Sequence, residues 1–531
     1  MRLHRLLTPA PALAVTLICL LWTSAPGSAL AQPPARVTPE ASRAPAPGER
    51  AVAEKPPAEE ELSQTQHVVR IGGVDVKYTA TAGTLLLRDE TGKPKANVFF
   101  VAYTRDDVTD RKRRPLTFAY NGGPGSASVW LHMGALGPKR VQMGEDGFQP
   151  APPFTLVDNQ ASIIDVSDLV MIDAISTGFS RPLPGEETKQ FHGVREDLRW
   201  FGEFIRRYVT RFDRWSSPKF LLGESYGTFR SAGLAAELQQ RHGIELNGII
   251  LVSTVLDMST IRFDGPNDLP YITNLPTYTA IAWYHKQLGA DLQGDLPKTL
   301  AASRAFAIGE YATALLKGSR LSAAERADVA RKVARFTGLD AGYVEQANLR
   351  VNPSRFRKEL LRDRRLSVGR LDGRYTSLDI DGAGETPEFD PSNTALQGAY
   401  TALFQEYVRR DLKFTSDLKY ETSANVQPWN YLDGPRMATS TTEMLRSAMA
   451  RNPFLKVLVV NGYYDLATPF FGAEYTFDHL GWEQTYGDRV SMAYYEGGHM
   501  MYIRIPMLEK LKADVAAFIR SASGQASAPT Q

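Results

Sequence analysis

Three side chains of the kinds used in acyl-transfer catalysis each follow an apolar segment: Ser225 in GESYG, Asp465 in VNGYYDLATP and His499 in YYEGGHMM. A serine hydroxyl is a weak nucleophile, so it needs an imidazole to accept its proton and a carboxylate to orient that imidazole. The three residues therefore predict a catalytic triad. In it Ser225 attacks a carbonyl carbon, His499 transfers the proton and Asp465 orients His499.

The prediction depends on the setting of these residues, because each one alone has a simpler explanation. A G-x-S-x-G pattern is a weak signal in a chain with 42 glycines, Asp465 is compatible with a turn, and His499 is one of eight histidines. Ser225, however, lies between the apolar run KFLLGE and the helix-favouring SAGLAAELQQ, and a serine on a strained turn needs small neighbours. His132, in VWLHMGALG, is apolar-flanked and is predicted to be a core residue.

A tetrahedral intermediate also needs two hydrogen-bond donors aimed at its oxyanion. The backbone N–H of Tyr226, directly after the nucleophile, is one candidate. The glycine-rich segment FAYNGGPGSASVW supplies the other, and Gly123 N–H is the predicted donor because the small residues let the backbone approach a substrate. The alternative for this segment is a plain tight turn.

The elements that must position these residues are strands alternating with helices. Short segments between residues 67 and 105 predict antiparallel strands with glycine-bearing turns: HVVRIGG, VDVKYTATAG, TLLLRDETG and KANVFFVAYTR. Later apolar runs, separated by helical stretches, predict a mostly parallel central sheet with helices on both faces. These runs are LTFAY, DLVMIDA, KFLLGE, NGIILVS, FLKVLVVNG and RVSMAYYEGG. The order Ser, Asp, His within this α/β pattern is that of the α/β-hydrolase fold.

The remaining segments give the predicted organisation. A positive start and the apolar ALAVTLICLLW, followed by Ala29 and Ala31, predict a signal peptide cleaved after Ala31 and export to the periplasm or outside the cell; an uncleaved anchor is the alternative. The predicted parts are 1–31 signal peptide, 32–65 disordered Pro/Ala/Glu-rich linker, 66–260 first core part, 261–444 helical lid insertion, 445–520 second core part and 521–531 flexible tail.

Composition excludes several classes of function. Cys19, the one cysteine, lies in the predicted signal peptide, so cysteine nucleophiles and thiolate metal sites are excluded from the mature chain. A net charge of +2 gives no reason to expect a nucleic-acid partner. The acidic segment DIDGAGETPEFD superficially resembles a calcium loop, but Ala383 takes a ligand position and Pro387 disfavours an exit helix, so a solvated loop is expected.

Together, NGGPGSAS and GESYG resemble the serine carboxypeptidases, the α/β-hydrolase family that removes C-terminal residues from peptides. MIDAISTGFS resembles that family's D-P-V-G-T-G-[FY]-S loop, with Ala174 in place of Pro and Ser176 in place of Gly. VNGYYDLATP and EGGHMM resemble its Asp and His segments. The similarity runs from about Leu116 to Phe263 and again from Pro453 to Tyr502.

The resemblance implies that Asn121 and Glu224 bind the terminal carboxylate of the substrate. Two carboxyl groups can share a hydrogen bond only if one is protonated, so Glu224 must be neutral, and activity should favour acidic pH. The family usually has Trp where this chain has Ala119, and a second Glu where it has Ala135, so the carboxyl pair is lost. The family disulfides are absent as well.

The expected function is an exported serine carboxypeptidase that acts on peptide or protein C-termini with no metal or organic cofactor. No nucleic-acid partner and no membrane span after signal cleavage are expected, and the sequence leaves the oligomeric state open. Two alternatives remain: an esterase or acyltransferase with the same triad, which the loss of the Trp and Glu makes more credible, and an inactive peptide-binding homologue.

Overall fold

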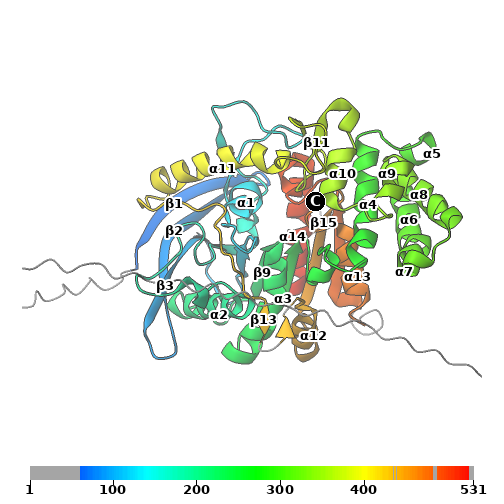
Figure 1. The fold of residues 1–531 in the computed structure, drawn as a ribbon. Helices are drawn as coiled ribbons and strands as arrows, with labels where there is room; N and C mark the ends of the chain where they lie inside the picture. The colour runs from blue at the N-terminus through cyan, green and yellow to red at the C-terminus, as the bar shows by residue number, and fades with distance from the viewer. Residues whose placement is uncertain (1–59, 434–435, 438, 482–486, 525–531) are drawn as a thin grey trace, which may run out of the picture. The chain divides into compact units, whose positions relative to one another are not determined.

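A ten-stranded sheet forms the centre of the computed structural model, which describes residues 60–433, 436–437, 439–481 and 487–524 (Figure 1). The strand order is β1-β2-β3-β7-β4-β9-β10-β15-β16, with the short β8 (Arg181–Pro182) paired to β3. Three predicted parts lie wholly or partly outside the described residues: the signal peptide 1–31, residues 32–59 of the linker 32–65, and residues 525–531 of the tail 521–531.

One side of the sheet is antiparallel and consists of β1 (Leu62–Ile71), β2 (Val74–Arg88) and β3 (Pro94–Arg105). Two sequence expectations are wrong here. VDVKYTATAG and TLLLR form one strand, because Gly83 stays in register with both neighbours; a Cβ on Gly83 would lie 2.0 Å from Glu61 O, so the glycine permits a close backbone approach. The linker predicted to extend to residue 65 gives way to β1 at Leu62, because its alternating residues pair with β2.

The other side is parallel, as predicted. Neighbouring strands in the run from β7 to β16 all pair in parallel. Every residue of β4, β7, β9 and β10 is buried, because helices cover both faces, and this explains why the strands read as continuous apolar runs. The strands are β7 (Asp168–Ile172), β4 (Leu116–Tyr120), β9 (Lys219–Glu224), β10 (Gly248–Val252), β15 (Lys456–Gly462) and β16 (Val490–Tyr495).

Each face of the sheet packs into its own hydrophobic cluster. One cluster joins the sheet to α1 (Val129–Leu131), α11 (Pro391–Arg410) and α14 (Ile505–Ala522). The other joins it to α2 (Val194–Arg211), α3 (Tyr226–His242), α12 (Thr442–Arg451) and α13 (Phe470–Asp478). The expected arrangement, a mostly parallel central sheet with helices on both faces, is confirmed. Within the described ranges, no helix is both long and apolar enough to cross a bilayer.

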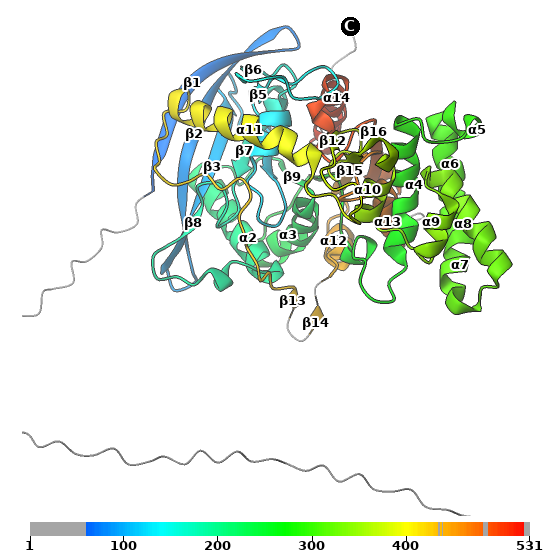
Figure 2. The same ribbon diagram turned by 45° about the horizontal axis from the view of Figure 1, so that its top comes forward.

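The segment 261–444 divides into two differently packed parts (Figure 2). Its first helices enclose a third hydrophobic cluster that also contains Tyr464 and Leu466, on either side of Asp465. α11 instead lies across the sheet face formed by the antiparallel strands, where Tyr407 O–H and Tyr103 O–H of β3 are 3.1 Å apart. The first helices are α4 (Leu269–Tyr284), α5 (Ala290–Gln293), α6 (Leu296–Phe306), α7 (Ala312–Lys317), α8 (Ala323–Thr337), α9 (Ala341–Gln346) and α10 (Pro353–Glu359).

Three small antiparallel strand pairs lie outside the central sheet. They are β5 (Lys139–Val141) with β6 (Leu156–Asp158), β11 (Leu366–Val368) with β12 (Thr376–Leu378), and β13 (Leu432–Asp433) with β14 (Arg436–Met437).

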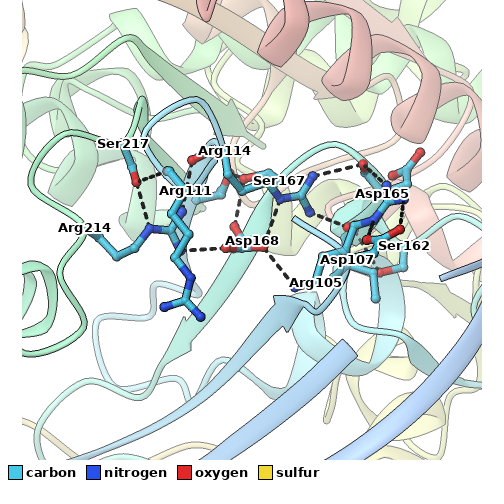
Figure 3. A network of polar contacts seen from close by, with 12 residues as sticks. Arg105, Asp107, Arg111, Arg114, Ser162, Asp165, Ser167, Asp168, Arg214 and Ser217 are labelled. Atoms are coloured by element: carbon cyan, nitrogen blue, oxygen red, sulfur yellow. Dashed lines mark hydrogen bonds and ion pairs between the residues drawn. The ribbon is translucent and has the colours of Figure 1, made fainter. Parts of the chain in front are cut away.

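A buried ionic network ties the amino ends of the central strands (Figure 3). Asp168, the first residue of β7, accepts hydrogen bonds from Arg114 Nε at 3.0 Å and from Arg214 Nη1 at 2.6 Å. The side chains of Asp168, Arg114 and Arg214 are at most 8% exposed. Because Arg114 precedes β4 and Arg214 follows α2, one carboxylate joins three segments.

We expect Asp168→Ala to lower the free energy of unfolding by about 3–5 kcal/mol, because it leaves two buried guanidinium groups without their shared counter-charge. Urea unfolding at neutral pH measures this. Asp158→Ala is the matched control: Asp158 also pairs with a cation, Lys139, but its side chain is 51% exposed, and the expected change is below about 1 kcal/mol. Equal changes in the two variants would contradict the structural role of Asp168.

Candidate active site

Ser225 occupies a strained turn between β9 and α3. Its φ of 61° and ψ of −128° are unfavourable for a residue with a Cβ. Ser225 N donates to Val252 O at 2.9 Å, which fixes the turn to the next strand. A Cβ on Gly223 would lie 2.1 Å from Gly227 O, so the turn closes only with glycine at these positions. The local sequence thus presents Ser225 at the carboxyl end of the sheet.

The glycine-rich loop after β4 lies directly against this turn. A Cβ on Gly122 would lie 2.4 Å from Tyr226 N, and Gly123 has a φ of 105°, which glycine adopts without strain. The segment after α11 closes the other side of the loop, since Ala424 N donates to Gly125 O at 2.7 Å. The two predicted oxyanion donors, the N–H groups of Gly123 and Tyr226, therefore belong to loops in contact.

His499 and Asp465 are in direct contact. His499 Nδ1 and Asp465 Oδ2 are 2.7 Å apart, and both side chains are buried. Asp465 Oδ1 accepts from the N–H groups of Ala467 and Thr468, at 2.7 and 3.1 Å, which fixes the carboxylate. Burial alone would lower the pKa of His499. The charge and hydrogen bond of Asp465, with a smaller contribution from Glu224, outweigh burial and hold that pKa above its usual value.

Ser225 and His499 line one cleft of about 250 Å³. No hydrogen bond joins the two side chains in the described part of the chain; such bonds are often long in unliganded enzymes and shorten when substrate binds. Asp465 does not line the cleft itself but is hydrogen-bonded to His499, which does. The ring of Tyr226 packs against Trp429. The cleft is lined by Asn121, Gly122, Gly123, Ser126, Trp130, Glu224, Ser225, Arg370, Leu371, Asn393, Leu396, Ser423, Ala467, His499 and Met500.

Glu224 and Asn121 are hydrogen-bonded to each other at the cleft. Asn121 Nδ2 donates to Glu224 Oε1 at 2.7 Å, and Asn121 Oδ1 accepts from Leu131 N at 3.0 Å, which sets the orientation of the amide. Burial raises the pKa of Glu224 to about 7, although the nearby His499 and two hydrogen bonds to its carboxylate lower it. This carboxyl group can therefore carry a proton at mildly acidic pH.

Tyr502 is a contact of Glu224 that the sequence reasoning missed. Its hydroxyl donates to Glu224 Oε2 at 2.7 Å. A Cβ on Gly134 would lie 2.6 Å from the Tyr502 ring, so the ring packs directly against the backbone of Gly134, the residue before Ala135. The phenol thus donates to Glu224 from beside the backbone segment that contains Ala135, where the family resemblance implies a second glutamate. No local signal in HMMYI points to this contact.

Arg230 is a second residue that was missed. It is fully buried, its Nε donates to Asp197 Oδ2 at 2.7 Å, and its Nη1 donates to Asn121 O at 2.8 Å. Its guanidinium also lies over the Phe201 ring, 4.2 Å from the centroid. Arg230 thereby fixes the backbone of the glycine loop. The sequence signal was an arginine within the small-residue run GTFRSAGLAA.

The segment 370–373 is hydrogen-bonded to the loop that carries Asp465 and to the loop that carries His499. On the other side of the segment, Asp390 at the start of α11 accepts from Arg370 N at 2.9 Å. The segment therefore bridges α11 and the triad loops. The bonds to those loops are Leu466 N to Arg370 O at 3.0 Å, Gly373 N to Tyr464 O at 2.9 Å, His499 N to Leu371 O at 2.5 Å and Gly498 N to Asp372 Oδ2 at 3.2 Å.

Two further residues from the sequence have structural partners. Asp379, in the acidic segment, pairs with Lys358 Nζ at 2.6 Å. His132 Nε2 lies 2.5 Å from Tyr103 O–H in the core, and burial lowers its pKa to about 3. Within the described ranges, no group of three or more His, Cys, Asp or Glu is placed to hold a metal ion.

Comparison with known proteins agrees with the resemblance in the motifs. The sequence is 33% identical over 156 residues to the pheromone-processing carboxypeptidase KEX1 from two strains of Saccharomyces cerevisiae. That alignment covers 27% of this chain and 20% of KEX1, so the chain spans about a fifth of the length of these curated relatives.

A solved structure, that of a prohormone-processing carboxypeptidase Kex1 from S. cerevisiae, covers 84% of this chain and 91% of its own. It has a TM-score of 0.53 at 17% identity and supports the fold. The family model described as serine carboxypeptidase matches residues 78–504. The chain belongs to the serine carboxypeptidase family.

Proposed function

We propose that this chain is an exported serine carboxypeptidase that hydrolyses the C-terminal peptide bond of peptides and proteins. The observation that carries the proposal is one cleft lined by Ser225, His499, Asn121 and Glu224, with Asp465 hydrogen-bonded to His499. This cleft combines a nucleophile and a base with two side chains that are suited to binding a terminal carboxylate. Membership of the serine carboxypeptidase family supports the same activity.

In the proposed reaction, Ser225 Oγ attacks the carbonyl carbon while His499 Nε2 takes its proton. Asp465 holds Nδ1 and stabilises the resulting imidazolium. The N–H groups of Gly123 and Tyr226 stabilise the oxyanion. His499 then protonates the leaving amine, and water hydrolyses the acyl-enzyme by the same steps in reverse.

The proposed anchor for the terminal carboxylate is protonated Glu224 together with the amide of Asn121. Since the pKa of Glu224 is about 7, the carboxyl group is mostly neutral below that pH and loses its proton above it. The charge on ionised Glu224 also raises the pKa of His499. When Glu224 keeps its proton, His499 loses that contribution and is more easily neutral, as a base must be. The two groups therefore titrate as a pair.

The proposed location is the periplasm or the exterior of the cell. It rests on the charged start, the apolar stretch before Ala31 and the linker composition of residues 32–65. Sequencing the N-terminus of the secreted or periplasmic protein tests it, with the mature chain expected to begin at Gln32.

The experiment that tests the activity compares a blocked dipeptide with a free C-terminus and its C-terminal amide. We expect kcat/KM to favour the free acid by about 100-fold at acidic pH, because two hydrogen bonds to a charged group are involved. The preference should fall as the pH rises through about 7, where Glu224 ionises. Equal rates on acid and amide at every pH would instead indicate an esterase or acyltransferase.

Tyr502→Phe tests the role of Glu224 separately. Removing the phenol hydroxyl removes a hydrogen bond that lowers the pKa of Glu224. The alkaline fall in kcat/KM for free-acid peptides should then move upward by about one pH unit. Tyr343→Phe, a half-buried tyrosine of α9, is the control and should leave the profile in place. An unshifted profile for Tyr502→Phe would rule out Glu224 as the group that sets this limb.

A further inference from the structure

The cleft contains a positive charge that the proposed reaction does not use. Arg370 lines the cleft together with Ser225, His499 and Glu224. Among the described residues that line it, Arg370 is the one side chain with a permanent positive charge, and Glu224 is the one carboxyl group. The charge reaches the reacting groups, since Arg370 lowers the pKa of His499.

The Arg370 guanidinium is available to a ligand. The residue is exposed, and in the described part of the chain its side chain makes no ion pair or hydrogen bond. Two buried arginines of the same region are engaged by protein acceptors: Arg357 donates to Val368 O at 2.9 Å, and Arg374 pairs with Asp372 at 2.6 Å. The Arg370 donors, by contrast with those of Arg357 and Arg374, are directed to no protein acceptor within the described residues.

The backbone of Arg370 is nevertheless well fixed. Its N–H donates to Asp390 Oδ1, and its carbonyl accepts from Leu466 N, the residue after Asp465. Position 370 is thus held at a set distance from the triad loops, while the side chain stays free to adjust. A cation held in this way suits recognition of a group near the scissile bond.

We propose that Arg370 binds a carboxylate of the peptide substrate through its planar guanidinium. This inference rests on the proposed function, and it makes peptides with a carboxylate next to the reacting bond the preferred substrate class. A guanidinium can bind a carboxylate through two parallel hydrogen bonds. Glu224 supplies a neutral donor and no charge when it is protonated, so Arg370 provides the counter-charge that the substrate carboxylate otherwise lacks.

Two carboxylates could occupy this position, namely the C-terminus itself and an acidic side chain beside the scissile bond. Binding measurements separate them. The ligands are acetyl-Phe-Leu as the free acid and as the amide, and acetyl-Phe-Glu-amide with acetyl-Phe-Gln-amide. Calorimetric titration uses the full chain with Ser225→Ala, so that no ligand is hydrolysed, with and without Arg370→Gln.

Arg370→Gln is expected to raise Kd by about five- to ten-fold for a ligand with the recognised carboxylate and to leave its neutral counterpart unchanged. Loss on acetyl-Phe-Leu assigns the terminal carboxylate, and loss on acetyl-Phe-Glu-amide assigns the side chain. Arg370→Lys should restore part of the affinity, because it keeps the charge but not the planar pair. Arg320→Gln, an exposed arginine outside the cleft lining, is the matched control.

Equal Kd values for Arg370→Gln and Arg320→Gln with all carboxylate ligands would overturn the inference. Its failure is distinguishable from failure of the proposed function, because binding does not require hydrolysis. If the chain with Ser225 intact cleaves no peptide but binding depends on Arg370, the carboxypeptidase activity fails and the Arg370 site stands. Cleavage of free-acid peptides with no Arg370 dependence gives the opposite result.

Discussion

Replacing Ser225 with alanine should lower kcat for a blocked free-acid dipeptide by about 10⁵-fold or more, while the protein stays folded. The loss is large because the Ser225 hydroxyl is the proposed attacking atom, and alanine has no nucleophile to replace it. Stability should change little or rise, since alanine removes only Oγ and the turn strain at φ 61° stays. Steady-state hydrolysis measures the first effect and urea unfolding the second.

Ser491→Ala is the matched control for Ser225→Ala. Ser491 is an exposed serine of β16, and its removal should leave kcat within two-fold or so. A fluorophosphonate probe should label the unmodified chain and Ser491→Ala but not Ser225→Ala. Wild-type turnover in Ser225→Ala would refute the triad. A folded chain that the probe does not label would identify an inactive peptide-binding homologue.

Asp465→Asn should reduce kcat by about 10⁴-fold with little change in KM. The carboxylate is held by Ala467 N and Thr468 N on Oδ1, so the amide oxygen is expected to take that place and the NH₂ group to face His499 Nδ1. His499 then has to accept at Nδ1 and carry its proton on Nε2. That tautomer cannot remove the proton from Ser225.

Asp514→Asn provides the control, because Asp514 also hydrogen-bonds a neutral ring side chain, Tyr495, but lies outside the cleft. Its kcat should stay near that of the unmodified chain. A loss of less than ten-fold for Asp465→Asn, together with normal folding, would mean that another group orients His499. Thr468 Oγ1, 3.3 Å from His499 Nδ1, is the first such group to examine.

The parallel half of the fold was predictable because burial on both faces leaves a simple pattern, a continuous apolar run such as LTFAY or KFLLGE. The antiparallel half was harder. Gly83 reads as a turn residue, yet it lies inside β2, where a neighbouring backbone approaches too closely for a side chain. Close approach is a tertiary property and has no local signature.

The same distinction applies to the site. Ser225, Asp465 and His499 follow strand ends, so the fold pattern brings their loops to one edge of the sheet. Tyr502 and Arg230 act through contacts with Glu224 and with Asn121 O, which depend on helix packing that the sequence does not reveal. Arg370 was missed because it lies in the segment 261–444, whose packing was not predictable from composition.

The four hydrogen bonds between residues 370–373 and the loops of Asp465 and His499 have a consequence for how substrates enter. A flap that swung open at this segment would have to break all four bonds, including the one to the backbone N–H of His499. We therefore expect this side of the cleft to keep its width during turnover, so that this width, and not the rate of an opening step, limits which substrates enter.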